Sequence, residues 1–476
     1  MEEEIEGGGG KILHVVMFPW LAIGHIKPFF RLSKSLAKKG HKISFISTPR
    51  NLSRIVKIPQ NLTHLINLIP IPLPEVPNLP PDAESSIDVP HVKQQLLKVA
   101  LDLLEPFIRS FLENVRPKPD WIVYDYASHW LPQIAIEIGI SRGFFSLFTA
   151  AFMAFLGPPS ILMDQKGGRS TAEDYTVVPD WIPFPSKMAF RLHEMTKNME
   201  KDAEGNDYDS GTSDTMRFGL SIKGSDIVIF RSCIEFEPEW FDLLNNQIYK
   251  KPVFPVSVLP ISMDDDELLL ESNEESWLEI RDWLDKQTHS SVVYVALGTE
   301  AILSKEEAQT LALGLEKCGL PFFWVLNRNS LLEMLPDGFR DRVKERGIVY
   351  TKWAPQIKIL SHPAVEGFLT HCGWNSVTEA LGFGRVLILF PMMNDQGLNC
   401  RLLEDKKLGV EIPRNEKTGS FTSDSVAESV RLAMVGEEGK IMRDNAKDMK
   451  GLFGDNNERS NSYIDNLIRY MINKGR

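Results

Sequence analysis

Short apolar runs alternate with amphipathic stretches along most of the chain. The runs are continuous, as in "ILHVVMF" and "SVVYVALG", and most are followed by a helical pattern. Continuous apolar strands joined by helices predict parallel sheets that are covered on both faces. We expect strands at 12–18, 41–47, 121–125, 144–148 and 226–230, and again at 291–298, 322–326, 348–353, 367–371 and 385–390.

Two such series predict an α/β protein with two doubly wound, Rossmann-like domains. The expected divisions are an N-terminal domain at 1–256, a linker at 257–276, a C-terminal domain at 277–456 and a final helix at 457–476 that can pack back on the N-terminal domain. The linker assignment rests on a Pro and a dense run of acidic residues. Segment 200–214, rich in Asp, Gly and Ser, is interpreted as a surface loop.

Charge, cysteine content and the longest apolar stretch limit the partners and the compartment that we expect for this protein. The 476 residues carry a net charge of −11, which argues against a nucleic-acid or anionic-membrane partner. Four widely spaced cysteines predict free thiols in the cytoplasm, and the acidic start is not a targeting peptide. The most apolar stretch, 143–157, is shorter than a membrane span and is expected to form a buried strand plus a pocket wall. We therefore expect a cytoplasmic monomer without stable membrane insertion.

The segment "FLTHCGWNSVTEALGFG" predicts a strand, a turn and a helix. Gly373 lets the backbone approach a ligand closely, and Asn375 and Ser376 are good residues for a helix start. The N–H groups and dipole at that end favour an anion. His371 can donate to the same anion, and Glu379, one turn beyond Asn375, suits the paired hydroxyls of a ribose.

Further polar and aromatic residues follow neighbouring strands. Asp395 and Gln396 come after the strand at 385–390 and suit a second polyol such as a sugar. Trp353 offers an indole for stacking on a base, and Thr299 offers a hydroxyl at another strand end. A metal site is disfavoured because His371 and Cys372 have no further ligands at usable spacing. A dinucleotide site is disfavoured because G-x-G-x-x-G is missing.

A candidate general base lies near the other end of the chain. In "FPWLAIGHIKPF", His25 follows the first strand and precedes a helix whose first turn holds Pro28. A neutral imidazole there can accept a proton, and Asp125, at the end of another strand, can orient it. A capping or core role for His25 remains equally compatible with these residues alone. Candidate acceptor contacts are Trp20, His129, Phe148 and Met153.

The stretch from Trp353 to Gln396 resembles the signature box of plant UDP-glycosyltransferases. Its landmarks are "WAPQ", "HPAVEGFLTHCGWNSVTEAL" and a closing "DQ", and the resemblance runs from "FPWLAIGHIKPF" to "LLEDKKLGVEIPRNE". The chain looks most like the family 91 branch, which includes enzymes that extend a sugar already attached to a terpenoid or flavonoid. Departures are Val386 for a usual Pro, Phe390 for a frequent Trp, and the pair Asn394–Asp395.

The resemblance implies a GT-B fold and specific roles for site residues. Trp353 would stack on uracil beside Ala354 and Gln356, and Glu379 would hold the ribose. The implied contacts of the diphosphate are His371, Asn375, Ser376 and Thr299. Those of the donor sugar are Trp374, Asp395 and Gln396, and Gly373 is a further donor-binding residue. His25 and Asp125 match the family's catalytic pair. No metal or cofactor is expected.

The predicted reaction is an inverting transfer from a UDP-sugar, with UDP-glucose as the expected donor, to a sugar hydroxyl of a terpenoid or flavonoid glycoside. The first alternative is direct glucosylation of a small phenol or enol. A non-catalytic binder of UDP-sugar is a further alternative, disfavoured by the intact His25 and Asp125. A nucleotide-dependent oxidoreductase is disfavoured by the missing glycine fingerprint.

Overall fold

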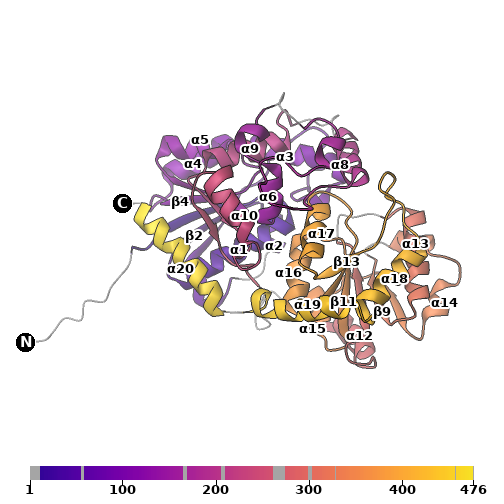
Figure 1. The fold of residues 1–476 in the computed structure, drawn as a ribbon. Helices are drawn as coiled ribbons and strands as arrows, with labels where there is room; N and C mark the ends of the chain where they lie inside the picture. The colour runs from indigo at the N-terminus through magenta and orange to yellow at the C-terminus, as the bar shows by residue number, and fades with distance from the viewer. Residues whose placement is uncertain are drawn as a thin grey trace, which may run out of the picture.

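The computed structural model describes residues 11–54, 58–164, 169–204, 210–260, 274–298, 303–326, 329–455 and 457–474. These residues form two parallel sheets that lie side by side, each covered by helices (Figure 1). The expected acidic linker, Thr299 and the middle of segment 200–214 lie largely or wholly outside the described residues.

The first sheet has seven strands in the order β3-β2-β1-β4-β5-β6-β7, all parallel. The strands are β1 (His14–Phe18), β2 (Lys42–Ser47), β3 (Ile66–Pro70), β4 (Trp121–Tyr124), β5 (Ser141–Ser146), β6 (Ile227–Phe230) and β7 (Val253–Pro255). The order reverses between β1 and β4, so the crevice of this doubly wound sheet opens at the carboxyl ends of these two strands.

The second sheet has six strands in the order β10-β9-β8-β11-β12-β13, again all parallel. They are β8 (Val292–Ala296), β9 (Phe322–Val325), β10 (Gly347–Tyr350), β11 (Val365–Thr370), β12 (Val386–Leu389) and β13 (Gly409–Glu411). Here the order reverses between β8 and β11. The two domains are therefore built on the same plan, which is the GT-B arrangement.

The helices of the N-terminal domain are α1 (Ile23–Lys38), α2 (Pro49–Arg54), α3 (Gln94–Asp102), α4 (Glu105–Asn114), α5 (Leu131–Ile138), α6 (Ala150–Leu156), α7 (Pro159–Leu162), α8 (Leu192–Glu204), α9 (Asp214–Gly224) and α10 (Pro238–Leu243). Those that follow are α12 (Glu274–Leu284), α13 (Lys305–Cys318), α14 (Phe339–Val343), α15 (Gln356–Ser361), α16 (Trp374–Gly382), α17 (Gln396–Asp405), α18 (Ser423–Met434), α19 (Lys440–Phe453) and α20 (Asn457–Lys474). None of these helices in the described part of the chain has the length and apolar composition that crossing a bilayer requires.

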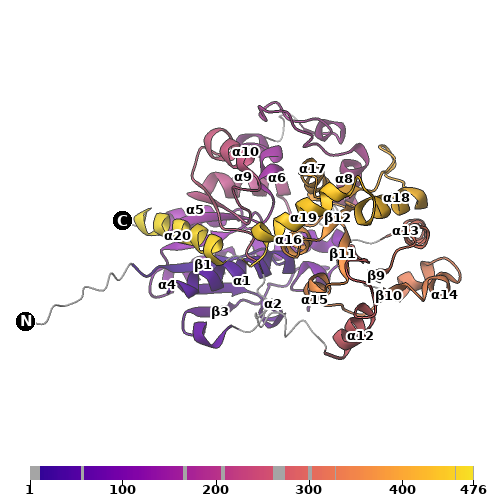
Figure 2. The ribbon, with the colours of Figure 1, turned by 60° about the horizontal axis from the view of Figure 1, so that its bottom comes forward.

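Both faces of the first sheet are buried, as the continuous apolar strands predict. On β1, Val15 and Met17 face one core, whereas Val16 and Phe18 face the other. The first of these cores contains apolar residues of α1 and also of α20. The yellow α20 thus leaves the C-terminal domain and lies along α1, at the N-terminal domain (Figures 1 and 2). Trp121 donates its indole N–H to the Met471 carbonyl at 3.1 Å, and Lys39 pairs with Asp465.

Five segments differ from the prediction made from the pattern. Strands β3, β7 and β13 were not predicted, and two of them have only three residues. The apolar stretch 143–157 contains β5 but continues as α6, whose start is capped by Thr149 accepting from the Phe152 N–H at 3.1 Å. Segment 200–214 was expected as a loop, but α8 continues to Glu204, and residues 205–209 lie outside the described part of the chain.

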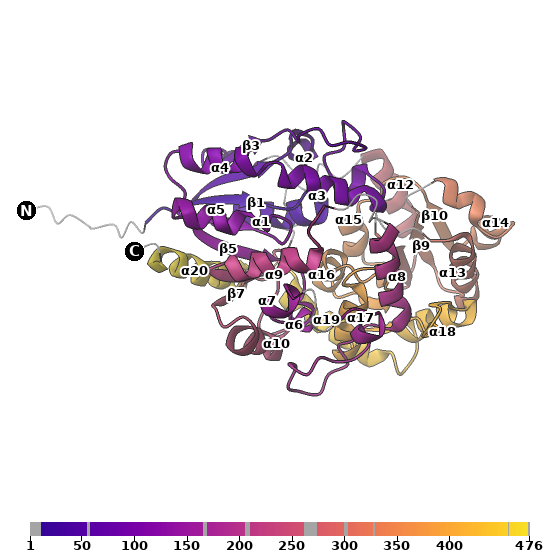
Figure 3. The same ribbon diagram turned by 90° about the horizontal axis from the view of Figure 1, so that it is seen from above.

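The start of α8 joins the two domains through a buried charge network. Arg401 of α17 donates to Glu194 at 2.8 Å and to Glu411 at 2.7 Å, and Arg191 donates to Glu411 at 2.6 Å. Asn198 accepts from the Asn394 N–H at 2.9 Å. Seen from above, α8 accordingly lies against the C-terminal domain (Figure 3).

Candidate functional site

His25 and Asp125 meet at the carboxyl ends of β1 and β4. The two strands are neighbours, with Phe18 in register with Tyr124, so the residues that follow them enter one crevice. The His25 Nδ1 lies 2.8 Å from the Asp125 Oδ2. Asp125 is buried and also accepts the Trp20 N–H at 2.7 Å and the Ala127 N–H at 3.2 Å. A carboxylate that accepts these bonds requires Nδ1 to donate, which leaves Nε2 as the acceptor nitrogen of the neutral ring.

Aromatic rings surround the imidazole. The ring centroids of Tyr126 and Phe148 lie 6.0 and 6.2 Å from that of His25, and Phe218 stacks on Tyr126 at 4.5 Å. Phe152 stacks on Phe148 at 4.9 Å. Of these, only Phe148 was predicted. The position of Tyr126 directly after Asp125 was a usable signal, whereas nothing in the sequence connects Phe218 of α9 with His25.

Three of the predicted acceptor contacts, Trp20, His129 and Met153, are buried or bonded to other protein groups. Trp20 and Met153 are 3% and 0% exposed, so both side chains are buried, and their contact with an acceptor stays a prediction. Met153 lies on α6 and packs into the core because the stretch after β5 is helical. The His129 Nδ1 accepts from Arg217 at 3.0 Å, and Arg217 also binds Asp102. Burial and Arg217 lower the pKa of His129.

His371 is held in a cradle of two glycines at the end of β11. A Cβ at Gly298 would come within 2.8 Å of the His371 Nε2, and one at Gly373 within 2.4 Å. Gly298 also has a φ of +78°, which favours glycine. Burial lowers the pKa of His371 to about 4, so the ring is neutral at neutral pH. Its buried Nδ1 has no hydrogen-bond partner among the described residues. A bound anion could supply the partner that such a buried nitrogen needs.

Three predicted residues meet beside the start of α16. The Gln356 side-chain amide donates to Glu379 at 2.8 Å and to the Ser376 hydroxyl at 3.2 Å. Trp353, in the loop between β10 and α15, leaves 51% of its surface exposed, whereas Ala354 is half-buried. The exposed indole of Trp353 offers a stacking face, and the Glu379 carboxylate and the Gln356 amide offer partners for hydroxyl groups.

Asn375 and Trp374 contact the N-terminal domain. The Asn375 amide donates to the Gly24 carbonyl at 3.2 Å, and its oxygen accepts from Arg231. The Trp374 indole is 4% exposed and donates to the Arg231 carbonyl at 3.1 Å. Its ring packs near Phe236 and Phe453. The Trp374 side chain is therefore part of the domain interface, and its contact with the donor sugar stays a prediction.

Asp395 and Gln396 begin α17. Burial raises the pKa of Asp395 to about 6, while a hydrogen bond from Asn399 and the charge of His25 oppose this shift. The Gln396 oxygen accepts the N–H groups of Met392 and Met393 at 2.9 and 3.0 Å, which leaves its NH₂ group as the donor that a sugar could use.

Thr149 is a site residue that sequence reasoning missed. Besides capping α6, it donates to Asn399 at 3.3 Å, and Asn399 in turn donates to Asp395 at 2.7 Å. This chain of bonds joins the N-cap residue of α6, in the N-terminal domain, to the predicted sugar contact Asp395. The predicted diphosphate contact Thr299 lies outside the described residues.

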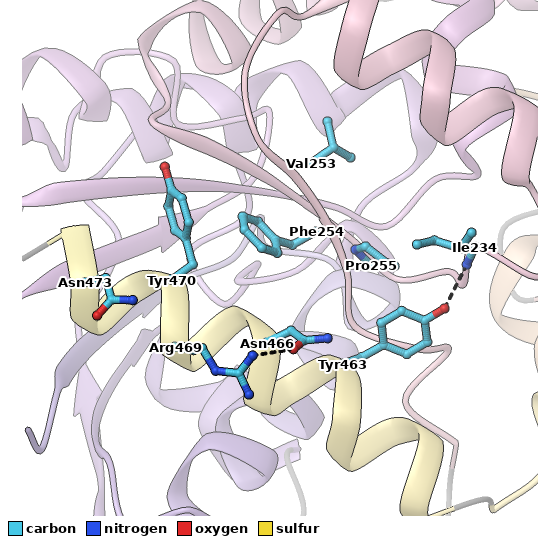
Figure 4. A pocket seen from close by; sticks show the side chains of 9 residues that line it. All are labelled: Ile234, Val253, Phe254, Pro255, Tyr463, Asn466, Arg469, Tyr470 and Asn473. Carbon is cyan, nitrogen blue, oxygen red and sulfur yellow. Dashed lines mark hydrogen bonds between the residues drawn. The ribbon is translucent and has the colours of Figure 1, made fainter. Parts of the chain in front are cut away.

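A separate groove of about 440 Å³ lies between β7 and α20 (Figure 4). It is lined by Phe254, Tyr463 and Tyr470 among others, and the Tyr463 hydroxyl accepts from the Ile234 N–H at 3.0 Å. No predicted site residue lines it. The groove marks where α20 seats on the N-terminal domain.

Possible metal ligands gather at one place in the described residues. Side-chain atoms of Cys400, Glu404 and Glu411 lie within 4.8 Å of one another. Glu411, however, already accepts from Arg191 and Arg401, and two guanidinium groups oppose the approach of a cation. We therefore assign no metal to this cluster.

Comparison with known proteins identifies the family. Residues 242–452 match the family model of UDP-glucoronosyl and UDP-glucosyl transferase. The chain is 56% identical to UDP-glycosyltransferase 91C1 of Arabidopsis thaliana, over 98% of each chain. It is 34% identical to an anthocyanidin-3-O-glucoside rhamnosyltransferase of Petunia hybrida, over 99% of this chain and 98% of the relative.

A solved structure agrees on the fold. The structure of apo UGT2 of Phytolacca americana superposes with a TM-score of 0.74 at 22% identity, over 96% of this chain and 99% of the other. The chain therefore belongs to the family 91 branch of the plant UDP-glycosyltransferases and is a GT-B enzyme that transfers sugar from a UDP-sugar donor.

Proposed function

We propose that this enzyme transfers a sugar, with inversion, from a UDP-sugar to a hydroxyl group of a sugar on a terpenoid or flavonoid glycoside, with His25 as general base. The observation that carries this proposal is the 2.8 Å contact between the His25 Nδ1 and Asp125, which directs the accepting Nε2 away from the carboxylate.

In the proposed step, the acceptor O–H gives its proton to the His25 Nε2 as its oxygen attacks the anomeric carbon. The bond between that carbon and the UDP oxygen breaks, and UDP leaves with its electron pair from the opposite face. Asp125 stabilises the imidazolium that forms, as a carboxylate paired with a catalytic His does. The N–H groups at the start of α16 and the ring of His371 stabilise the charge on the leaving diphosphate.

The proposed donor contacts rest on the resemblance to the family, and the bonds from Gln356 to Ser376 and Glu379 support them. Trp353 stacks on the uracil beside Ala354, and Gln356 and Glu379 bind the ribose. Asn375, Ser376, Gly373 and Thr299 complete the diphosphate seat, and Asp395, Gln396 and the Trp374 backbone serve the sugar. We take UDP-glucose as the first donor to test. The rhamnosyltransferase relative makes UDP-rhamnose the second.

The acceptor proposal rests on the family branch and on the surroundings of His25. The Petunia relative is named for action on a glucoside, which is a sugar acceptor. The rings of Tyr126, Phe148 and Phe218 suit the apolar part of such a glycoside. The same rings favour the alternative, direct glucosylation of a phenol or enol aglycone, because they also lie beside the base.

Matched pairs of acceptors separate these two possibilities. The enzyme is incubated with UDP-glucose or UDP-rhamnose and with flavonoid and terpenoid aglycones and their monoglucosides, and products are analysed by tandem mass spectrometry. We expect a disaccharide fragment from the monoglucosides. Sugar gained on the aglycones alone would refute the glycoside proposal and support the alternative. Inversion is read from the anomeric coupling constant of the product.

We further propose a monomer that works in the cytoplasm. All four cysteines are buried free thiols, which suits a reducing compartment. Light scattering during gel filtration measures the mass, and a dimer would contradict the first part of this proposal. Localisation of a fluorescent fusion tests the second.

A further inference from the structure

Arg231 lies directly after β6 in the N-terminal domain, but its side chain reaches into the C-terminal domain. It is only 1% exposed. Its Nη2 donates to the Thr378 hydroxyl at 3.0 Å, its Nη1 donates to the Asn375 oxygen, and its Nε donates to the Val258 carbonyl at 2.7 Å. The flat guanidinium thus uses all three of its nitrogens.

The backbone of Arg231 is held as well. Its N–H donates to the Ser146 carbonyl at 3.1 Å, and its own carbonyl accepts the Trp374 indole N–H at 3.1 Å. Ser146 ends β5, whereas Trp374 begins α16. Arg231 therefore connects the carboxyl end of β5 in the first sheet to the first turn of α16.

This arrangement determines how Asn375 is oriented. A guanidinium only donates, so the Asn375 group that faces it must be the oxygen. The NH₂ group is thereby turned to the Gly24 carbonyl at 3.2 Å. Gly24 is in the first turn of α1 and immediately precedes His25, and a Cβ there would lie 3.3 Å from the Asn375 nitrogen. The contact is close and directional.

We propose that Arg231 is a positioning residue. By holding Asn375, it aligns His25, the proposed proton acceptor, with the start of α16, where the diphosphate leaving group is proposed to bind. This connection fixes the distance between the N-terminus of α1, which carries His25, and the N-terminus of α16. The inference rests on the proposed roles of these two helix starts, and it assigns Arg231 no contact with substrate. Errors of about 1 Å in such an alignment can reduce turnover by about 100-fold.

The experiment is a double-mutant cycle of Arg231→Lys and Asn375→Ala with any acceptor that the enzyme uses. Lysine keeps the charge but lacks the fork that binds Asn375 and Thr378 together. We expect Arg231→Lys to lower kcat by about 10- to 100-fold while the Kd for UDP changes by less than about threefold. Because Arg231 acts through Asn375, the double variant should be no slower than the slower single variant.

Arg191→Lys is the matched control, because Arg191 also crosses between the domains but does so at the start of α8. It should keep kcat within about twofold, because its partners Glu411 and Glu416 belong to no part of the proposed site. Thr378→Val, which removes a single partner of Arg231, should give a smaller loss of the same kind and serves if Arg231→Lys folds poorly. Additive losses in the cycle, a UDP Kd that rises in proportion to the lost turnover, or an equal loss in Arg191→Lys would each overturn the proposal.

Failure of this inference can be told apart from failure of the proposed function. The cycle compares rates for one acceptor and does not depend on which group removes the proton. If His25→Ala retains full activity, the base is wrong, but a non-additive cycle would still show that Arg231 acts through Asn375.

Discussion

The side-chain amide of Asn375 donates to the Gly24 carbonyl at 3.2 Å, although the two residues are 351 positions apart. One belongs to the helix start that we assign to the leaving diphosphate, and the other precedes the proposed base. The contact joins the two halves of the proposed site.

Replacement of Asp125 by Asn tests the orientation of His25. An amide can present its NH₂ group to Nδ1, which would move the ring proton to Nε2 and remove the proton acceptor. We expect kcat to fall by about 10³- to 10⁴-fold with little change in the Kd for UDP. Asp120→Asn is the matched control, because Asp120 precedes the amino end of β4 and binds the His14 N–H. Equal activity of the two variants would contradict the assigned role.

Removal of the Trp353 indole tests the proposed uracil contact. Because the ring is 51% exposed, Trp353→Ala should leave the melting temperature unchanged. The Kd for UDP, measured by calorimetry, should rise by about 10-fold through loss of stacking, and Trp353→Phe should recover part of it. An unchanged Kd in the alanine variant would exclude stacking on this ring.

The elevated pKa of Asp395 predicts pH-dependent recognition of the donor sugar. Below about pH 6 the carboxyl is protonated and loses acceptor capacity. The affinity for UDP-glucose should therefore fall by about 10-fold relative to the affinity for UDP. The comparison of the two ligands at each pH cancels effects on the nucleotide. Asp395→Asn should remove this dependence, and a ratio that stays constant between pH 5 and 8 would refute the assignment.

The raised pKa of Asp395 also predicts that the ligand-free protein is stabilised by acidification, whereas its affinity for the donor sugar falls. The ordinary pKa of 3.8 applies to the unfolded chain, so the folded protein holds the extra proton between about pH 4 and 6. Asp395 therefore contributes less stability as the pH rises through that window. Ligand-free Asp395→Asn should consequently be more stable than the parent at pH 7.5, as measured by thermal unfolding.

The buried network around Arg401 predicts a large effect on folding. Arg401→Met would leave Glu194 and Glu411 buried with fewer cations, which should lower the free energy of unfolding by about 3–5 kcal/mol. Arg342→Met, which breaks an exposed pair with Glu316, should change the free energy of unfolding far less, because solvent screens that pair. Urea denaturation provides both values. Similar losses in the two variants would show that burial does not distinguish these pairs.

The sequence supported those features that depend on local pattern. Continuous apolar strands predicted two parallel sheets, and the landmarks from Trp353 to Gln396 follow one another in the chain. His25 and Asp125 could be paired because parallel strands bring their carboxyl ends together. Very short strands such as β13 carry too few residues for a pattern.

Contacts between the domains could not be read from the sequence. The roles of Arg231, Thr149 and Asn399 depend on how two separately folded sheets meet, and no periodicity encodes that. Trp374 was assigned to the sugar by its place in the motif, but its indole lies in the domain interface. Met153 was assigned to a pocket wall, but a helical turn directs it into the core.

The central claim is that His25 removes the acceptor proton. Its most direct test is His25→Ala, assayed for sugar transfer by mass spectrometry and for UDP binding by calorimetry on the same preparation. We predict that transfer falls by about 10²- to 10⁴-fold while the Kd for UDP stays within about twofold. Normal turnover in this variant would contradict the account.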